Sequence, residues 1–437
     1  MIGASEEGML EQVVYTPGVS VRSDVVIIGA GAAGLSLAER LCTAVGRSAL
    51  TVRLVQAPAG PLRPAPRTWC FWERGAGRYD EAVTAAWNRM RVRSPGGELV
   101  DASTGSLLYK MIRSTDFEQA IERRLAGQRT MTCTEGTVEA VEGTTGGAQV
   151  LVRTAEGEQK WLSARWVFDS RPLGSLPPAR TTLLQHFRGW FVRTPHPVFD
   201  TGSIELMDFR TPQPERGLAF NYVLPTSPHT ALVEYTQFSA SVLPTDCYDR
   251  ALQNYLQAVL DVRDFHIEAR EEGVIPMTDA QFARQSGESI FRIGAAGGAT
   301  RPSTGYTFAT IQRQTAAIAA ALHAGRRPVP PAPYSKRSRA MDAVLLHALA
   351  SGRIDGAAYF TRLFARVPTE RLLRFLDGAT TPYEDLSIGL NSPILPLLLS
   401  AVALPSRPLP PPPPPDLTGS AKENHADHAR CHPHPRV

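Results

Sequence analysis

A run of β-branched residues that ends in a glycine pattern constrains this chain more than any other feature. Residues 24–34 read DVVIIGAGAAG, and the run from Val25 to Ile28 has the length and composition of a buried parallel strand. Apolar residues then recur with helical spacing, at Leu35, Leu37, Ala38 and Leu41. The stretch therefore predicts a strand, a tight turn and a helix, which is the context that a dinucleotide-binding motif requires.

The three glycines of this motif have separate expected roles. Gly29 makes the tight turn, Gly31 lets the backbone approach a pyrophosphate, and Gly34 lets the helix pack on the strand. Amides at the helix N-terminus would then face the phosphates. A plain glycine-rich turn is the alternative, but the strand before it and the helix after it favour the nucleotide. Gln56 stands where a ribose-binding carboxylate is usual, and its amide offers a hydrogen bond without the charge.

The composition is that of a globular protein with room for more than one domain. The chain has 437 residues and a formal net charge of +4, which argues against a dedicated nucleic-acid binder. Its five cysteines are scattered without CxxC spacing, and its first ten residues carry acids where a signal peptide needs bases. We therefore expect a cytoplasmic protein with no metal site, no nucleic-acid partner and no export signal. The oligomeric state stays open.

An aromatic cluster, RTWCFWE at residues 67–73, follows a link rich in proline and arginine. Strand alternation would place Trp69 and Phe71 on one face and Cys70 and Trp72 on the other. Both faces would then need an apolar cover, which core packing or a ligand would provide.

Several further elements are predicted in the first half of the chain. A second strand covers residues 50–55, and a helix capped by Thr115 or Asp116 ends at Leu125. A polar hairpin covers residues 136–161. A buried strand at residues 164–172 ends in Asp169, Ser170 and Arg171, where an α/β sheet presents polar groups to a ligand.

The second half changes from strands to helices. Strands separated by turn residues are expected between residues 186 and 236, with a covering helix at 247–262. The chain then returns to the first domain through a strand at 290–293, a glycine-rich loop and a helix at 306–323. The loop and the N-terminus of this helix are expected to make a second contact to the same cofactor. Residues 335–400 read as helical. PILPLLLSAVAL (393–404) is too short and too interrupted for a membrane span, and a buried helix and a helix lying on a bilayer are both left open.

The order of the motifs resembles the lycopene β-cyclases of carotenoid synthesis. The matching stretches are RTWCFWE, YKMIR followed by DF, FDSRP, QHFRGW, LMDFR, YVLPTSP, LVEYT, and IGAAGG with RPSTGYTF. The resemblance runs from about residue 25 to about residue 399. It implies an α/β fold: an FAD-binding Rossmann-type domain of the flavoprotein hydroxylase kind, with an inserted β-rich substrate domain and C-terminal helices. The predicted division is 23–185 and 286–330 for FAD, 186–285 for substrate, 331–404 for the helical region, and 405–437 for a disordered tail.

The resemblance also implies a reaction and its residues. The family closes β-rings at the ψ-ends of lycopene, giving γ-carotene and β-carotene, without net redox change. It requires reduced FAD, with NAD(P)H as the reductant. Glu234 in LVEYT matches the family's essential acid, and Trp69, Phe71 and Trp72 are assigned to the substrate. Linear carotenoids are the expected partners, reached through peripheral contact with membrane lipid. The residues assigned to FAD are Gly29, Gly31, Gly34, Gln56, Gly294, Gly297, Gly298, Pro302 and Gly305.

Two departures from related sequences bear on the function: the first argues against hydroxylation, and the second keeps the assigned acid. Flavin hydroxylases commonly carry an Asp after the glycine of the terminal strand, whereas Gly294 is followed by Ala295, as the cyclases tend to have. Plant cyclases carry two adjacent glutamates in the acid motif, whereas Glu234 is followed by Tyr235. The alternatives are an FAD-dependent monooxygenase or isoprenoid reductase acting on a membrane lipid, and a non-catalytic isoprenoid carrier.

Overall fold

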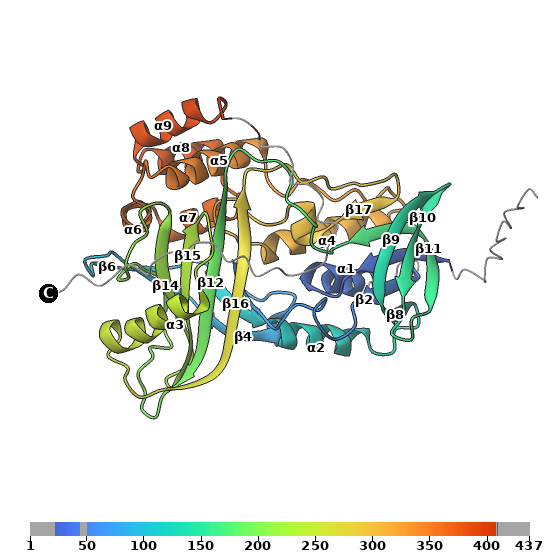
Figure 1. The fold of residues 1–437 in the computed structure, drawn as a ribbon, viewed down its shortest axis with the longest axis horizontal. Helices are drawn as coiled ribbons and strands as arrows, with labels where there is room; N and C mark the ends of the chain where they lie inside the picture. The colour runs from blue at the N-terminus through green and yellow to red at the C-terminus, as the bar shows by residue number, and fades with distance from the viewer. Residues whose placement is uncertain (1–21, 44–49, 408, 410–437) are drawn as a thin grey trace, which may run out of the picture.

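The protein consists of two lobes that lie side by side (Figure 1). The computed structural model describes residues 22–43, 50–407 and 409. Each lobe is built on its own large sheet, and a small third sheet pairs none of its strands with either. The predicted disordered tail lies outside the described residues, apart from 405–407 and 409.

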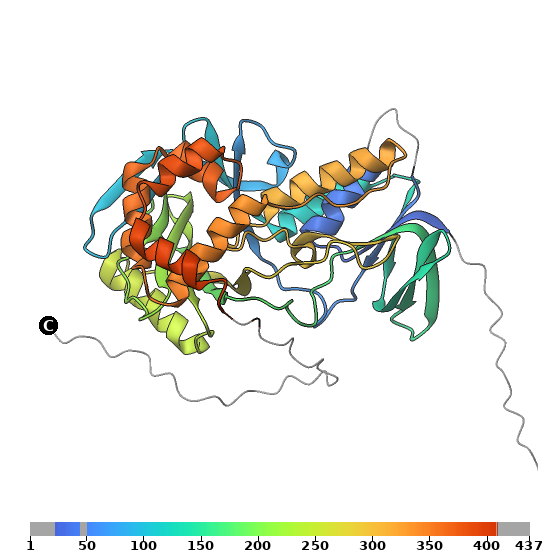
Figure 2. The same ribbon diagram turned by 90° about the horizontal axis from the view of Figure 1, so that it is seen from above.

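The first sheet contains the glycine motif. Its strand order is β8-β2-β1-β11-β10-β9, and β17 pairs with β11. β1 is parallel to β2 and β11, as the buried apolar run predicted. Helices α1 and α4 run side by side along this lobe (Figure 2). The bounds are β1 (Ser23–Ile28), α1 (Ala32–Cys42), β2 (Val52–Gln56), β8 (Met131–Glu135), β9 (Thr137–Thr144), β10 (Gly147–Arg153), β11 (Gln159–Asp169), β17 (Ile290–Arg292) and α4 (Phe308–His323).

The second sheet is mainly antiparallel, with the order β16-β12-β15-β14-β13-β5-β6. Helix α3 covers one of its faces, where Val233 and Tyr235 pack against Tyr248 and Leu252. The opposite face carries Leu232 and packs into a core shared with the C-terminal helices. The bounds are β5 (Arg89–Arg93), β6 (Leu99–Ser103), β12 (Thr182–Arg193), β13 (Ile204–Asp208), β14 (Leu218–Ser227), β15 (Thr230–Ser239), α3 (Thr245–Asn254) with a π-turn at Tyr255–Val259, and β16 (His266–Thr278).

The third sheet and the C-terminal helices complete the molecule. The third sheet has the order β3-β7-β4, and the helix α2 follows β7 directly. The C-terminal helices lie along the side of the second sheet in Figure 2. The bounds are β3 (Thr68–Arg74), β4 (Val83–Trp87), β7 (Leu107–Arg113), α2 (Ser114–Leu125), α5 (Lys336–Ala350), α6 (Gly356–Arg366), α7 (Thr369–Leu376), α8 (Pro382–Gly389) and α9 (Ile394–Ala403).

Most predicted elements are confirmed, and two details differ. Helix α2 begins at Ser114 with Arg113 as N-cap, so Thr115 and Asp116 lie inside its first turn and do not cap it. Strands β5 and β6 come from the first segment of the sequence-based division, yet β5 pairs with β13 of the second sheet. A long-range strand pairing of this kind leaves no local signal in the sequence.

The apolar segment of α9 is exposed rather than buried. Only Ser400 of this helix is buried, while the side chains of Leu395, Leu398 and Val402 face outward. Within the described residues no single helix is long and apolar enough to cross a membrane, and α8 and α9 reach that composition only as a pair bent by 115°. The interpretation of this segment as a buried helix is therefore wrong.

Candidate active site

The first glycine motif forms a turn with room for a phosphate. Gly29 has a φ of +94°, and a Cβ on Gly34 would collide with the carbonyl oxygen of Gly29, so the helix approaches the strand as closely as predicted. A Cβ on Gly31 would meet nothing within 4 Å. No side chain caps the N-terminus of α1, and its first amides are thus free to bind an anion.

The return segment lies against this turn. A Cβ on Gly294 would stand 3.0 Å from the Cβ of Ala33 in α1, so the two glycine-rich segments are in contact. Gly298 and Gly305 have φ values of +79° and +74°, and Gly297 leaves no room for a side chain beside the carbonyl of Arg292.

The polar side chains at the end of β11 bond to one another and to the backbone of the same sheet. Asp169 and Arg171, which were expected to face a ligand, form an ion pair with an Nη2–Oδ2 distance of 2.8 Å. Ser170 donates to the carbonyl oxygen of Ile28 at 2.7 Å and so fixes the end of β1. Gln56 lies at the end of β2, where its side-chain carbonyl accepts from Arg63. The uncapped helix and the open space at Gly31 together fit a dinucleotide.

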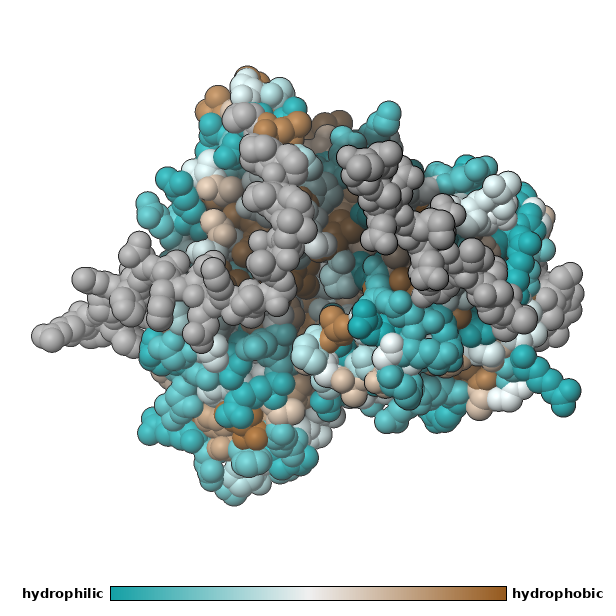
Figure 3. All heavy atoms as spheres, turned by 45° about the vertical axis from the view of Figure 1, so that its right-hand side comes forward, coloured by the Kyte–Doolittle hydropathy of each residue, from teal (hydrophilic) through white to brown (hydrophobic). Residues whose placement is uncertain are grey.

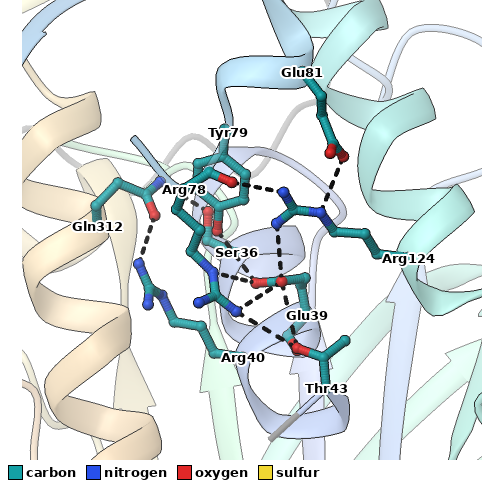
Figure 4. A network of polar contacts seen from close by, with 9 residues as sticks. All are labelled: Ser36, Glu39, Arg40, Thr43, Arg78, Tyr79, Glu81, Arg124 and Gln312. Atoms are coloured by element: carbon teal, nitrogen blue, oxygen red, sulfur yellow. Dashed lines mark hydrogen bonds and ion pairs between the residues drawn. The ribbon is translucent and has the colours of Figure 1, made fainter. Parts of the chain in front are cut away.

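A buried carboxylate holds helix α1 in place (Figure 4). Glu39 of α1 is 2% exposed and accepts a bidentate pair from Arg78, with distances of 2.8 and 2.7 Å. Arg124 of α2 adds a third bond at 3.1 Å. The network joins α1, α2 and the turn before β4, so it orients the helix without facing a ligand.

Glu234 lies in the middle of β15, on the face opposite α3. Its direct cross-strand neighbours are Tyr222 on β14 and Gly189 on β12, and Gly189 is in turn opposite Glu271 on β16. Direct neighbours share a face of the sheet, so these four residues form one row. We call Tyr222, Glu234, Gly189 and Glu271 the acidic row.

The surroundings of Glu234 favour its protonated form. Burial raises the pKa of its carboxyl to about 8, and the negative charge of Glu271 adds to the effect. The hydroxyl of Thr236 donates to Oε1 at 2.8 Å, which is the single opposing contribution. Glu234 is half-buried, and its charge acts on Cys70 and Tyr306, which line a small gap together with Trp72.

Aromatic rings surround the same gap. The rings of Trp72 and Tyr306 meet edge to face at 4.6 Å, and the hydroxyls of Tyr306 and Tyr109 are 3.4 Å apart. Tyr222 joins them from the acidic row, in contact with Tyr306. Since Tyr306 directly follows Gly305, the return segment leads from the glycine turns to the acid.

The aromatic cluster on β3 divides between two places, as strand alternation predicted. Trp72 faces the gap beside Glu234. Trp69 and Phe71 point the other way, where they pack on Phe308 with ring distances of 5.6 and 4.7 Å. Trp72 is thus linked to Glu234 through Tyr306, whereas Trp69 and Phe71 pack on Phe308. The assignment of these residues to the substrate stays a prediction.

Sequence reasoning missed most of the residues around the acid. Tyr222, Tyr306, Gly189 and Glu271 were not singled out as site residues, although Tyr306 lies in the RPSTGYTF motif. The alternation of β14 and β15 could have placed Tyr222 beside Glu234 once their pairing was known. Nothing in the local sequence distinguishes Glu271 from Glu272 beside it.

Comparison with known proteins gives the family. The family model described as "Lycopene cyclase protein" matches residues 24–402. The chain belongs to the lycopene cyclase family. The cyclase is 29% identical over 386 residues to a protein of Deinococcus radiodurans named "Uncharacterized carotenoid cyclase", covering 82% of this chain and 87% of that one. It is 26% identical over 319 residues to a "Lycopene beta-cyclase" of Pseudescherichia vulneris, covering 70% and 76%. Carotenoid cyclisation is the activity that this family membership supports.

Solved structures similar to the cyclase confirm the fold class. One is a geranylgeranyl bacteriochlorophyll reductase-like protein of Thermoplasma acidophilum, with a TM-score of 0.56 and 12% identity, covering 88% of the cyclase and 99% of that chain. Another is p-nitrophenol 4-monooxygenase of Pseudomonas putida, with a TM-score of 0.55 and 12% identity, covering 89% and 98%. The cyclase thus has the α/β fold of the flavoprotein hydroxylases.

Proposed function

We propose that this protein is a lycopene β-cyclase in which Glu234 is the proton donor. The observation that carries the proposal is the position of Glu234, a carboxyl with a pKa of about 8 that lies close to Tyr306 and Cys70 of the small gap. A carboxyl that stays protonated near neutral pH is suited to protonating a carbon–carbon double bond. Donation to the terminal double bond of lycopene would give a tertiary cation, which the neighbouring double bond attacks to close the six-membered ring.

The rings beside Glu234 would stabilise the positive charge. Trp72 and Tyr306 line the gap, and Tyr109 and Tyr222 contact Tyr306. A cation–π contact contributes about 2 kcal/mol when water is excluded. The enclosed position also keeps water from capturing the cation. Proton loss from the ring then gives a product with no net redox change.

Reduced FAD is the proposed cofactor, with NAD(P)H as its reductant. The uncapped N-terminus of α1 would hold the pyrophosphate at Gly29, Gly31 and Gly34, and Gln56 would lie near the ribose. The return segment, Gly294 to Gly305 with Pro302, would hold the remainder. Bound reduced flavin supplies an electron-rich ring system that stabilises positive charge.

The test is an anaerobic assay with lycopene in liposomes, FAD and NADPH. We expect ring products from the wild type, with far less NADPH consumed than product formed. Glu234→Gln should lose at least 100-fold in rate because it cannot donate the proton. Glu272→Gln is the control, since Glu272 is exposed and pairs with Arg188 on the outer part of the sheet. Stoichiometric NADPH consumption would support a reductase instead, and full activity of Glu234→Gln would assign the acid elsewhere.

We also propose that the cyclase meets the bilayer through α8 and α9. Exposed apolar side chains gather there, and Figure 3 shows apolar surface at the top of the molecule, where these helices lie in Figure 1. A surface of this kind suits contact with lipid, from which a long apolar polyene would be taken up. A peripherally membrane-associated protein on the cytoplasmic side is the localisation that follows.

A further inference from the structure

The acidic row contains a second buried carboxyl that the proposed function does not use. Glu271 is 9% exposed and shares the inner face of the sheet with Glu234. Its neighbour on the opposite face, Glu272, is paired with Arg188 near the surface. A buried carboxyl close to an active-site acid requires an explanation, because burial of a second negative charge is costly.

Gly189 connects the two carboxyls. A Cβ at this position would stand 3.4 Å from Cγ of Glu271, 3.5 Å from Cβ of Glu234 and 2.8 Å from Leu232. Its φ does not lie in the left-handed region, so the backbone does not require glycine there. The absent side chain therefore makes room for the side chain of Leu232 and lets the two glutamates approach each other.

The two carboxyls differ in their partners. Burial raises the pKa of Glu271, but the hydroxyl of Thr68, which donates a hydrogen bond to it at 2.7 Å, and the charges of Arg113 and Arg67 oppose that rise. The guanidinium of Arg113 is fixed 4.5 Å from the ring centre of Phe191, also on the inner face. Glu234 has no such cation among its contributors. Unequal surroundings of this kind assign one carboxyl as acid and the other as base.

The strand β3 runs along the row and adds a second observation. Thr68, Cys70 and Trp72 alternate onto one face of β3. Thr68 bonds Glu271, Cys70 lies near both carboxyls, and Trp72 contacts Tyr306 beside the gap. Both glutamates are therefore directed toward the space in which the aromatic rings lie.

We propose that Glu271 is a catalytic base of the cyclisation and accepts the proton that leaves the newly closed ring. This inference rests on the proposed function and assigns it a further residue. Glu234 gives its proton to the terminal double bond, and ring closure moves the positive charge to the methyl-bearing ring carbon. The C–H bond of the adjacent carbon that carries the polyene then breaks, its electron pair forms the β-ring double bond, and the proton goes to Glu271. Transfer of that proton back to Glu234 past Gly189 restores the starting state.

The position of the base would also determine the type of ring. The same cation can lose a proton from a different neighbouring carbon, which places the double bond elsewhere in the ring. A base fixed on one side of the cation selects one of these carbons. Removing it should change the ratio of ring isomers, whereas a defect in packing would lower the rate without changing that ratio.

The experiment compares Glu271→Gln, Glu271→Asp and Glu272→Gln in the anaerobic lycopene assay, with ring isomers separated by chromatography. We expect Glu271→Gln to lose about 100-fold in rate and to release a mixture of ring isomers. Glu271→Asp should restore the β-ring as the main product, because it keeps a carboxylate. Glu272→Gln should match the wild type in both respects.

Folding and flavin content, measured by circular dichroism and by bound flavin absorbance, accompany each variant. If Glu271→Gln does not fold, Thr68→Val tests the same idea by removing the hydroxyl that holds the base, with a smaller loss of rate and the same shift in ring isomers. A folded Glu271→Gln with wild-type rate and a pure β-ring product would overturn the role of Glu271. Absence of ring products from the wild type itself would instead overturn the proposed function.

The pH profile gives an independent readout. The groups that face the two carboxyls are Cys70 on β3, Tyr222 on β14, Tyr306 in the return segment, and Arg67 and Arg113 beside Glu271. Removal of the Glu271 charge should shift the alkaline limb of kcat/KM, which reports Glu234, to lower pH. If Glu271→Gln changes neither the alkaline limb of kcat/KM nor the ratio of ring isomers, the role of Glu271 is purely structural.

Discussion

At the scale of single residues, the environment of Glu234 sets its chemistry. Glu234 and its sequence neighbour Tyr235 lie on opposite faces of the sheet, and Tyr235 packs with α3. Burial and the Glu271 charge keep a proton on Glu234 in the native state at pH values where an unfolded glutamate has lost it. The proposed acid function of Glu234 thus depends on its position in the sheet as well as on its carboxyl group.

Glu234 should make the stability of the protein depend on pH. Its pKa is about 8 in the folded protein against an ordinary 4.5, so the folded state binds more protons in this range. Stability should therefore fall as pH rises from about 4.5 to about 8, by at most about 1.4 kcal/mol per pH unit. Glu234→Gln removes this dependence and should be more stable than the wild type at pH 9, but not at pH 5. Urea denaturation at both pH values measures the difference.

The matched control for this prediction is Glu272→Gln, which changes an exposed carboxyl on β16 of the same sheet. It should leave the pH dependence of the wild type intact. Parallel stability curves for the wild type and Glu234→Gln between pH 5 and pH 9 would contradict a raised pKa for Glu234.

At the scale of elements, the sequence predicted most where a local rule governs the backbone. The strand β1, its glycine turn and α1 were predictable because strand length, glycine position and helix spacing all agree. The position of Glu271 was not, because it depends on the register between β12 and β16, which are more than 70 residues apart in sequence. Register of this kind follows from packing of whole strands, which a local pattern does not contain.

The glycine turn offers a prediction that separates packing from cofactor binding. Gly34→Ala should lower the stability of the protein by several kcal/mol, because its Cβ would collide with the carbonyl of Gly29. Gly31→Ala should fold normally, since its Cβ meets nothing within 4 Å, but should bind FAD at least 10-fold more weakly because the methyl group occupies space next to the pyrophosphate. Thermal denaturation of the apoprotein and FAD titration measure the two effects.

Equal FAD affinity of Gly31→Ala and the wild type would show that no phosphate lies at this turn. Gly146→Ala is a suitable control, because it changes a glycine in the hairpin between β9 and β10, where its Cβ meets nothing within 4 Å. That variant should keep its FAD affinity even if the positive φ of Gly146 costs some stability.

At the scale of the whole molecule, the return segment connects the two lobes. Its Gly294 contacts α1 of the first lobe, and its Gly305 lies against Gln185 of the second sheet. Arg301, 1% exposed, pairs with Asp342 of α5 at 2.9 Å and so ties the same segment to the C-terminal helices. A cofactor held by the glycines would therefore lie between the nucleotide-binding lobe and the acid of the substrate lobe.

The proposed membrane contact would place the apolar side of α9 against the bilayer. Leu398 and Val402 are 57% and 69% exposed and lie one turn apart. The double variant Leu398→Asp/Val402→Asp should bind vesicles of phosphatidylcholine and phosphatidylglycerol at least 10-fold more weakly, because each apolar side chain that enters lipid contributes about 2 kcal/mol. Its thermal stability should match the wild type, since neither side chain packs in the core.

Vesicle sedimentation measures the binding, and Leu62→Asp/Val198→Asp is the control because both residues are exposed on other parts of the surface. If both double variants lose binding equally, α9 makes no specific contact with lipid. If only the α9 variant loses binding, and it stays active in detergent micelles but not in liposomes, this helix is the route by which substrate leaves the bilayer.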